Sequence, residues 1–140
     1  MEAELMHTTV ARDSALTDVL ASFRGSIIDA RLAYPEVLHL DVRDDKGELW
    51  QFATQDASWL PSDPAEMRYK SIVRAEIDWS TGKLNCELSD GATLMVTPAP
   101  QEEPDDPPNW ELFTPNGLLL EFGPGEHWRL GDADELDRHP

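Results

Sequence analysis

Residues 109–130 alternate short apolar stretches with tight-turn residues, and this pattern restricts the region to antiparallel strands. The stretch reads NWELFTPNGLLLEFGPGEHWRL, with turn residues at Pro115-Asn116-Gly117 and at Gly123-Pro124-Gly125. Apolar residues at every second position indicate a strand with one buried face, and glycine-containing turns join such strands into hairpins. The stretch therefore predicts three strands separated by two tight turns.

Two earlier stretches follow the same plan. Residues 26–32 (SIIDARL) and 71–77 (SIVRAEI) match position for position, 45 residues apart, and each precedes an alternating strand, a turn and a return strand. Glycines 47, 91 and 117 hold matching places in the three turns. A ribbon of two or three strands is marginal alone, so such units must bury their apolar faces against one another. We interpret residues 26–53, 71–97 and 110–130 as three copies of one β unit.

The period-two pattern also predicts which side chains face the core. Cys86 falls on an alternating apolar face and is expected to be a small core residue. His39 alternates with apolar neighbours and is expected to face away from the core. The other inward positions predicted by this alternation are Ile28, Ala30, Leu32, Leu38, Leu40, Val42, Trp50, Phe52, Trp79, Leu84, Leu88, Leu94, Val96, Trp110, Leu112, Leu120 and Phe122.

The segments around these units complete a single domain over residues 1–140. Residues 1–12 lack periodicity and are expected to form a loose arm. Residues 14–24 are expected to form a helix, because Leu16, Val19, Leu20 and Phe23 share one helical face before Gly25. A short helical turn is expected near residues 63–68, a proline-rich acidic linker at 98–109, and an acidic tail at 131–140.

The predicted fold class is therefore all-β. We expect an antiparallel roll, sandwich or partly open barrel, built from repeated β-hairpin units and carrying one N-terminal α-helix. The spacing of the strand signals predicts about eight or nine strands.

Acidic residues dominate the charge. The chain has 28 acidic and 11 basic side chains, a net charge of −17, and residues 101–140 hold 11 of the acids but only two bases. Such a field repels nucleic acids and anionic membranes and attracts basic proteins. The charge thus predicts a basic protein partner and excludes a nucleic-acid partner. Solubility alone is the alternative explanation of the same charge.

The location predicted by the sequence is cytoplasmic. The first residues have neither a basic segment nor an apolar run of a secretory signal, and no apolar run approaches the ~18 residues of a membrane helix. A single cysteine also excludes an internal disulfide framework. No membrane association is expected, and the oligomeric state stays open.

No motif in the sequence predicts catalysis, a metal or a cofactor. The four histidines are not spaced as zinc ligands, and the acidic stretches at 44–48 and 132–137 lack calcium-loop spacing. With 28 carboxylates, some pair must lie close in any fold, so proximity alone does not identify an acid and a base. The sequence favours a protein without enzymatic activity and leaves a carboxylate-dependent enzyme open.

Six residues are candidates for a partner surface. An exposed tryptophan surrounded by acidic residues is suited to anchoring a protein partner. The alternative is that each tryptophan covers an end of the apolar core. The candidate partner-binding residues are Trp59, Asp105, Asp106, Glu126, His127 and Trp128.

The runs RGSIIDARL, LHLDV and WELFTPNGLLLEFGPG resemble small uncharacterised bacterial all-β proteins, some of which are similar to immunity proteins encoded beside secreted toxins. The resemblance covers about residues 24–130 and rests on turn and core residues, so it implies a fold and carries no catalytic residue.

The sequence as a whole predicts a non-enzymatic protein-binding module, with an immunity-like role implied by the resemblance, that presents an acidic surface to a basic protein. Two alternatives stay open at this point. One is a small-ligand-binding β-barrel or small carboxylate-dependent enzyme, and the other is a structural or oligomeric subunit.

Overall fold

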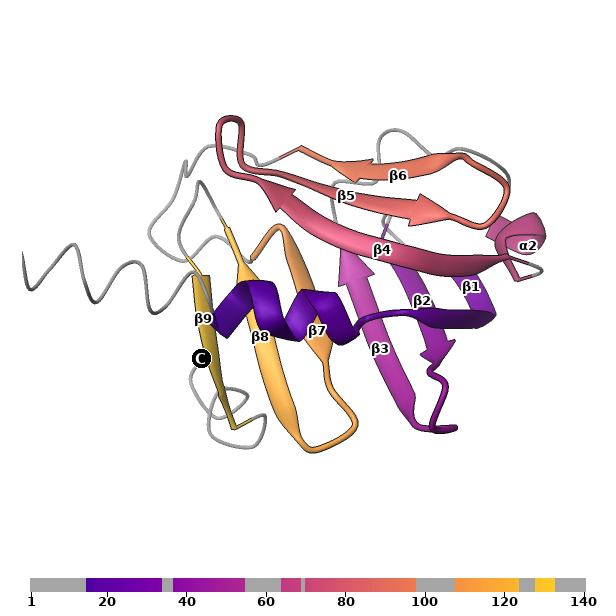
Figure 1. Cartoon of the computed structure of the whole chain (residues 1–140), viewed down its shortest axis with the longest axis horizontal. Coiled ribbons are helices and arrows are strands. Elements are labelled where there is room, and N and C mark those ends of the chain that lie inside the picture. The colour runs from indigo at the N-terminus through magenta and orange to yellow at the C-terminus, as the bar shows by residue number, and fades with distance from the viewer. Residues whose placement is uncertain are drawn as a thin grey trace, which may run out of the picture.

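A single antiparallel sheet dominates the computed structural model (Figure 1), which describes residues 15–33, 37–54, 64–68, 70–97, 108–123 and 128–132. Within these residues nine strands follow the order β6-β5-β4-β1-β2-β3-β7-β8-β9. The predicted all-β fold with an N-terminal helix is confirmed. The strands are β1 (Gly25–Ala33), β2 (Val37–Arg43), β3 (Leu49–Thr54), β4 (Ser71–Asp78), β5 (Lys83–Leu88), β6 (Thr93–Val96), β7 (Trp110–Phe113), β8 (Leu118–Phe122) and β9 (Trp128–Asp132).

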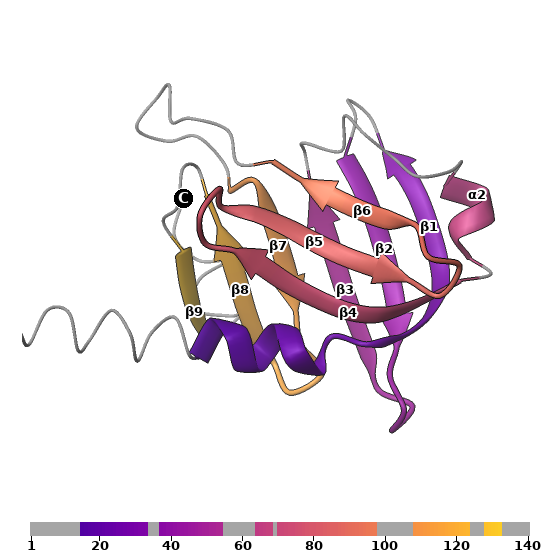
Figure 2. The same ribbon diagram turned by 45° about the horizontal axis from the view of Figure 1, so that its top comes forward.

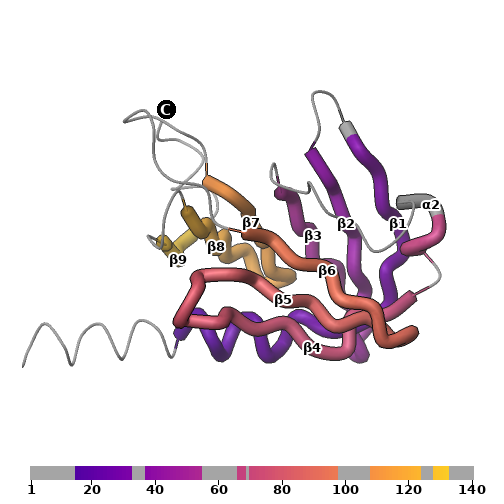
Figure 3. The backbone as a smooth tube through the Cα atoms, turned by 90° about the horizontal axis from the view of Figure 1, so that it is seen from above, coloured from indigo at the N-terminus to yellow at the C-terminus, as the bar shows by residue number. Residues whose placement is uncertain are grey.

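The sheet bends sharply between β1 and β4, so that one part of it lies across the face of the other. These two strands pair only through Gly25 with Ile72 and Ser26 with Ser71, whereas β1 pairs with β2 along almost its whole length. The first meander (β1, β2, β3) therefore continues into β7, β8 and β9 as one layer, the wide layer of the molecule. The second meander (β4, β5, β6) crosses the face of that layer (Figures 2 and 3). The molecule is thus an open sheet folded into two layers.

The N-terminal helix completes the second layer. Its described residues, 15–22, lie across the face of β7, β8 and β9 beside β4 (Figure 1). Leu16, Leu20 and Phe23 are fully buried and Val19 packs against the core, as the helical periodicity predicts. A second, one-turn helix, α2 (Pro64–Met67), lies beside β1 within the predicted span and buries Met67. No helix among the described residues is long and apolar enough to cross a membrane.

The core lies between the two layers and follows the predicted alternation. Leu38, Leu40 and Val42 of β2 are completely buried, and Cys86 of β5 is buried as expected. Aromatic side chains link the helix to the wide layer: the Phe23 ring lies 5.7 Å from Trp50, and Trp110 stacks on Phe122 at 5.4 Å. The helix and the wide layer therefore share one apolar core.

Two predictions about inward residues are wrong in β1, one because of a β-bulge and the other because the far end of the strand is uncovered. The register of β1 against β2 shifts between Ile27 and Asp29, so Ile27 is buried and Ile28 is 41% exposed. A bulge places one extra residue in a strand and changes which side chains face inward. Leu32 is also half exposed, because β4 departs from β1 after two residue pairs and leaves the far end of β1 uncovered on that side.

The second meander has its bulge at the matching place. The register of β4 against β5 shifts between Ile72 and Arg74, which buries Ile72 and exposes Val73. The predicted inward position of Trp79 is also wrong. This residue follows the end of β4 in a turn, is 40% exposed, and only approaches the core at Phe122, 6.5 Å away. Strand alternation does not extend into a turn, which is why the pattern misplaced it.

Three hairpin turns, those after β2, β5 and β7, close with the same hydrogen bonds. In each turn the first residue's N–H donates to the carbonyl of the fifth, and the fourth residue, a glycine with positive φ, donates its N–H to the carbonyl of the first. These glycines have φ values of 78°, 89° and 87°, a region that residues with a Cβ rarely occupy. The turns span residues 44–48, 88–92 and 114–118, with glycines Gly47, Gly91 and Gly117.

Candidate binding pocket at the edge of the wide layer

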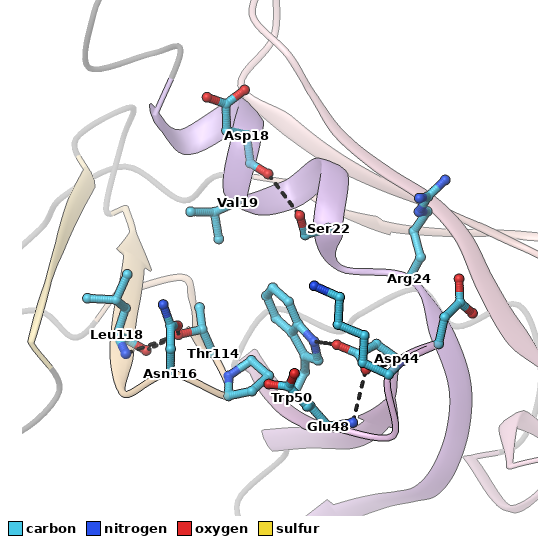
Figure 4. Close-up of a pocket in the computed structure, with 13 residues that line it drawn as sticks. Asp18, Val19, Ser22, Arg24, Asp44, Glu48, Trp50, Thr114, Asn116 and Leu118 are labelled. Carbon is cyan, nitrogen blue, oxygen red and sulfur yellow. Dashed lines mark hydrogen bonds between the residues drawn. The ribbon is translucent and has the colours of Figure 1, made fainter.

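An open pocket lies where the end of the N-terminal helix meets the turns at 44–48 and 114–118 (Figure 4), with a volume of about 480 Å³. The sheet register brings these two turns together. Gln51 of β3 pairs with Phe113 of β7, so the turn before β3 and the turn after β7 emerge at the same end of neighbouring strands. The pocket therefore depends on β3 and β7 being neighbours, although they are far apart in the sequence.

Trp50 forms the wall of the pocket nearest the core. Its side chain is only 5% exposed, and its ring contacts Phe23, whose centroid lies 5.7 Å away. The Trp50 Nε1–H donates a hydrogen bond of 2.9 Å to Asp44 Oδ2. The indole is thus fixed from two sides, by an aromatic neighbour in the core and by a carboxylate in the adjacent turn.

Asp44 organises the turn and is saturated by donors. Its Oδ1 accepts hydrogen bonds of 2.9 Å from the backbone N–H groups of Lys46 and Glu48, while Oδ2 accepts from Trp50. The Trp50 bond first, and then the Glu48 backbone bond, hold the pKa of the Asp44 carboxyl below its usual value. This carboxylate is therefore ionised at neutral pH and serves the turn, which makes it a poor general base.

The rim of the pocket carries uncommitted charge. Four acidic and two basic side chains line it, and Asp18, Asp45 and Glu48 form no ion pair within the part of the chain that the structure describes. The basic members are Arg24, just after the helix, and Lys46, in the 44–48 turn. The lining is thus acidic on balance, with both charge signs within reach of a ligand.

The opposite side of the pocket is neutral. The turn at 114–118 contributes Thr114, Pro115, Asn116 and Leu118, and Val19 adds an apolar surface from the helix. Thr114 Oγ1 accepts a 3.0 Å hydrogen bond from the Leu118 N–H, which fixes this turn as Asp44 fixes the other. A ligand would therefore meet apolar walls and a rigid indole beneath a charged rim.

Only one of the six predicted partner-binding residues, Trp128, is among the described residues, and it does not line this pocket. Trp59, Asp105, Asp106, Glu126 and His127 lie outside the described residues. The sixth, Trp128, starts β9 opposite Phe122 and packs, partly buried, against the core. This packing fits the alternative interpretation, in which a tryptophan covers an end of the apolar core, and a role of Trp128 in partner binding stays a prediction.

Sequence reasoning missed the pocket, although it recognised part of it. The acidic run at 44–48 was correctly assigned to a hairpin turn, and Trp50 to the core. The pairing of Asp44 with Trp50 could have been found from the sequence, because the two residues flank one tight turn. The helix end and the 114–118 turn could not, since only tertiary contacts bring them there.

Other reactive side chains in the described residues are buried or held by hydrogen bonds and ion pairs. Burial raises the pKa of the Cys86 thiol to about 12, so it is protonated and unreactive at neutral pH. Hydrogen bonds from Ser80 lower the pKa of Asp78, and the Lys70 ammonium lowers that of Asp90. No group of three or more potential metal ligands lies together in the parts of the chain that are described.

The acidic charge is distributed unevenly between the described residues and the rest of the chain. The described residues contain 14 acidic and nine basic side chains, a net −5, while the remaining residues contain 14 acidic and two basic side chains, a net −12. Among the described residues, ion pairs such as Lys70–Asp90 at 2.8 Å and Arg74–Glu87 at 3.2 Å use several of these charges. Most of the excess therefore lies outside the nine strands.

The comparisons with known proteins add no relative. No protein-family model, curated protein or solved structure matches this chain. The resemblance to small bacterial all-β proteins therefore stays a prediction, and function has to be argued from the chain itself.

Proposed function

We propose that this protein is a non-enzymatic binding module for a basic protein partner. The observation that carries the proposal is the uneven charge, with a net −12 on the residues outside the described ranges and a pocket rim that is acidic on balance. The described residues account for only a net −5 of the charge, with 14 acidic and nine basic side chains, so most of the excess is not part of the described fold. Charge that the fold does not use is available to a partner.

Electrostatic attraction of this kind acts mainly on the rate of association. A net charge of −17 draws a cationic surface toward the protein, and salt screens this attraction at separations beyond the Debye length, which is about 10 Å at 0.1 M salt. Charged residues at an interface also reject partners of like sign. The proposal therefore requires association that falls steeply as salt is raised.

A defined cationic probe tests the proposal. A fluorescein-labelled peptide of alternating arginine and serine would be titrated with the full chain, and anisotropy measured from about 0.05 M to about 0.5 M salt. We expect affinity to fall at least about tenfold across this range. A peptide with citrulline in place of arginine keeps the shape without the charge and should bind much more weakly. Equal binding of the two peptides, or affinity independent of salt, would contradict the proposal.

An immunity-like role in the cytoplasm is the specific form of this proposal that the resemblance favours. The module would then cover the active surface of a basic toxin and block it by steric and electrostatic means. Co-purification with the product of an adjacent toxin-like gene, followed by loss of that toxin's activity in the complex, would support this form. An adjacent gene product that stays fully active in the presence of the chain would count against it.

A small ligand is the second candidate, and the pocket itself favours it. A volume of about 480 Å³ falls within the range of about 300–1,000 Å³ that is common for small-molecule sites. The pocket lies at the surface, at the ends of β3 and β7, and the space between the two layers is filled by the apolar core. This argues against a ligand enclosed inside a barrel. Saturation by a small molecule that leaves arginine-peptide binding unchanged would show that the two functions are separate.

We also infer that the first and second meanders descend from one repeated unit. Three observations support this: the strand order, the position of the bulge, and the hydrogen bonds of the glycine turn are the same in both. Exchange of the turn at 88–92 for the sequence of the turn at 44–48 should then preserve the fold. An unfolded exchange variant would contradict the inference.

A further inference from the structure

We infer that the pocket between the N-terminal helix and the turns at 44–48 and 114–118 receives one basic side chain, an arginine or a lysine, from the partner protein. The inference rests on the proposed function and assigns the position on this chain where a basic partner would be anchored. The central side chain of this site is Trp50, with Asp45 and Glu48 on the rim.

The indole is held in place at the floor of the pocket, where 5% of Trp50 is exposed and an entering cation would meet that part of the ring. Trp50 is held by Phe23 and by its hydrogen bond to Asp44, so its orientation does not have to be fixed on binding. Tryptophan is the aromatic side chain that attracts a guanidinium or ammonium group most strongly, within about 6 Å of the ring. Rigid aromatic groups are effective anchors because little conformational freedom is lost when a partner binds.

The charges of the rim favour a cation over an anion. Asp45 and Glu48 belong to the same turn and are exposed, and Asp18 adds a third carboxylate from the helix. Asp44 supplies a fourth negative charge next to the indole, kept ionised by its lowered pKa. An entering guanidinium would exchange water for carboxylate partners, with its aliphatic stem against Val19 and Leu118.

Lys46 makes the choice of ligand testable. It lies in the same turn, is exposed, and belongs to the pocket lining, so its ammonium competes for the carboxylates that an entering cation would use. Lys46→Ala should therefore strengthen binding of a basic peptide. If the pocket held an anion instead, the same substitution would remove a favourable charge and weaken binding of that anion.

The experiment compares two variants of equal net charge. Asp45→Asn with Glu48→Gln removes two carboxylates from the rim, while Glu66→Gln with Glu76→Gln removes two exposed carboxylates that do not line the pocket. The probe is the fluorescein-labelled arginine–serine peptide at low salt. We expect the rim variant to bind about tenfold more weakly and the control variant to change by less than about twofold. Lys46→Ala should bind about two- to threefold more tightly.

The outcomes separate this inference from the proposed function. An equal loss in the rim and control variants, with the salt dependence kept, would overturn the pocket and leave the acidic binding module standing. Loss of the salt dependence itself would overturn both. Weaker peptide binding by Lys46→Ala would also overturn the assignment of a cation.

A direct readout comes from the indole of Trp50. Its N–H gives one of the five tryptophan indole signals in a ¹H–¹⁵N spectrum, which Trp50→Phe would assign. Titration of the wild-type chain with the arginine–serine peptide should shift this signal, together with the backbone amides of Gly47 and Gly117. Shifts confined to other tryptophans would overturn the inference even if the peptide binds.

Discussion

The first and second meanders are built alike, yet only the first contributes to the pocket at the 44–48 and 114–118 turns. Both have a bulge two residues after the matching serines, Ser26 and Ser71, and both close their second hairpin with a glycine turn. They differ at the residue before the matching serines. Ser26 follows Gly25, whereas the matching Ser71 follows Lys70, whose ammonium reaches Asp90 at 2.8 Å. The residue before each serine therefore differs in what it brings to the turn at 44–48 or at 88–92.

Glycine at position 25, where the first meander begins, lets the end of the helix lie close to the turn at 44–48. A Cβ at Gly25 would lie 2.1 Å from the Arg43 carbonyl oxygen, so β1 can begin against the end of β2 only with glycine there. Because two residues separate the helix from β1, this close start places the end of the helix over the turn. In the second meander Lys70 precedes the matching serine and its side chain pairs with Asp90 of the turn, and no residue of this meander lines the pocket.

The largest expected effect tests whether the two bulges match. Ile27→Ala and Ile72→Ala should each lower the free energy of unfolding by about 3 kcal/mol, because each leaves a cavity in the core. Ile28→Ala and Val73→Ala should each cost less than about 1 kcal/mol, because these side chains are exposed. Urea denaturation measures all four. A cost at Ile28 equal to that at Ile27 would place β1 in the unbulged register and break the comparison.

The next effect concerns the entry glycine. Gly25→Ala should lower the free energy of unfolding by about 2–3 kcal/mol, because it adds a backbone clash to an unfavourable φ of 150°. Gly47→Ala is the matched control, since a Cβ there meets no atom within 4 Å. It should cost about 1 kcal/mol, for the left-handed backbone alone. Equal costs would show that close approach at Gly25 is unimportant.

A smaller effect should appear as a pH dependence of stability. The pKa of Asp44 is lower in the folded protein than the ~3.9 of an unfolded aspartate, so its stabilising contribution is complete above about pH 4 and disappears as the pH falls through the folded pKa. Asp44→Asn should flatten the loss of stability between neutral and acidic pH. Glu76→Gln, an exposed control, should leave the acid limb steeper than Asp44→Asn does. Identical acid profiles of wild type and Asp44→Asn would contradict the assigned role of this carboxylate.

The smallest expected change is at Cys86, whose thiol should hardly be alkylated in the folded protein. Its thiol is buried and has a pKa of about 12, so iodoacetamide at mildly alkaline pH should label the folded chain negligibly. Addition of urea should restore labelling by exposing the thiol. Cys86 pairs with Ala75 and Leu94 inside the second meander, and rapid labelling without denaturant would show that this meander opens more readily than its contacts imply.

Most strands, the turns and the helix could be predicted because each depends on residues close in the chain. Alternation placed Leu38, Leu40 and Val42 inward, and glycine at the fourth turn position identified the hairpins. The errors lie where local regularity is interrupted. Ile28 was misplaced because a bulge leaves no clear mark in a run of apolar residues, and Trp79 because the strand ends just before it.

The candidate site was much less predictable. The Asp44 turn and the buried Trp50 could each be recognised, but the pocket also needs the helix end and the turn at 114–118. Those come from segments separated by about ninety residues of chain. No local pattern indicates that β7 pairs with β3, and without that pairing the turn at 114–118 has no known neighbour.

The sequence by itself determined the local structure of this protein: the alternating strands of 109–130 and of the two earlier segments, the glycine turns between them, and the amphipathic helix. These follow from the period of side-chain direction and from the backbone freedom of glycine, which act over a few residues. The tertiary structure alone decided the two-residue contact of β1 with β4, the pairing of β3 with β7, and hence the pocket. Those choices come from burying apolar faces against one another, an energy that depends on contacts between residues distant in sequence.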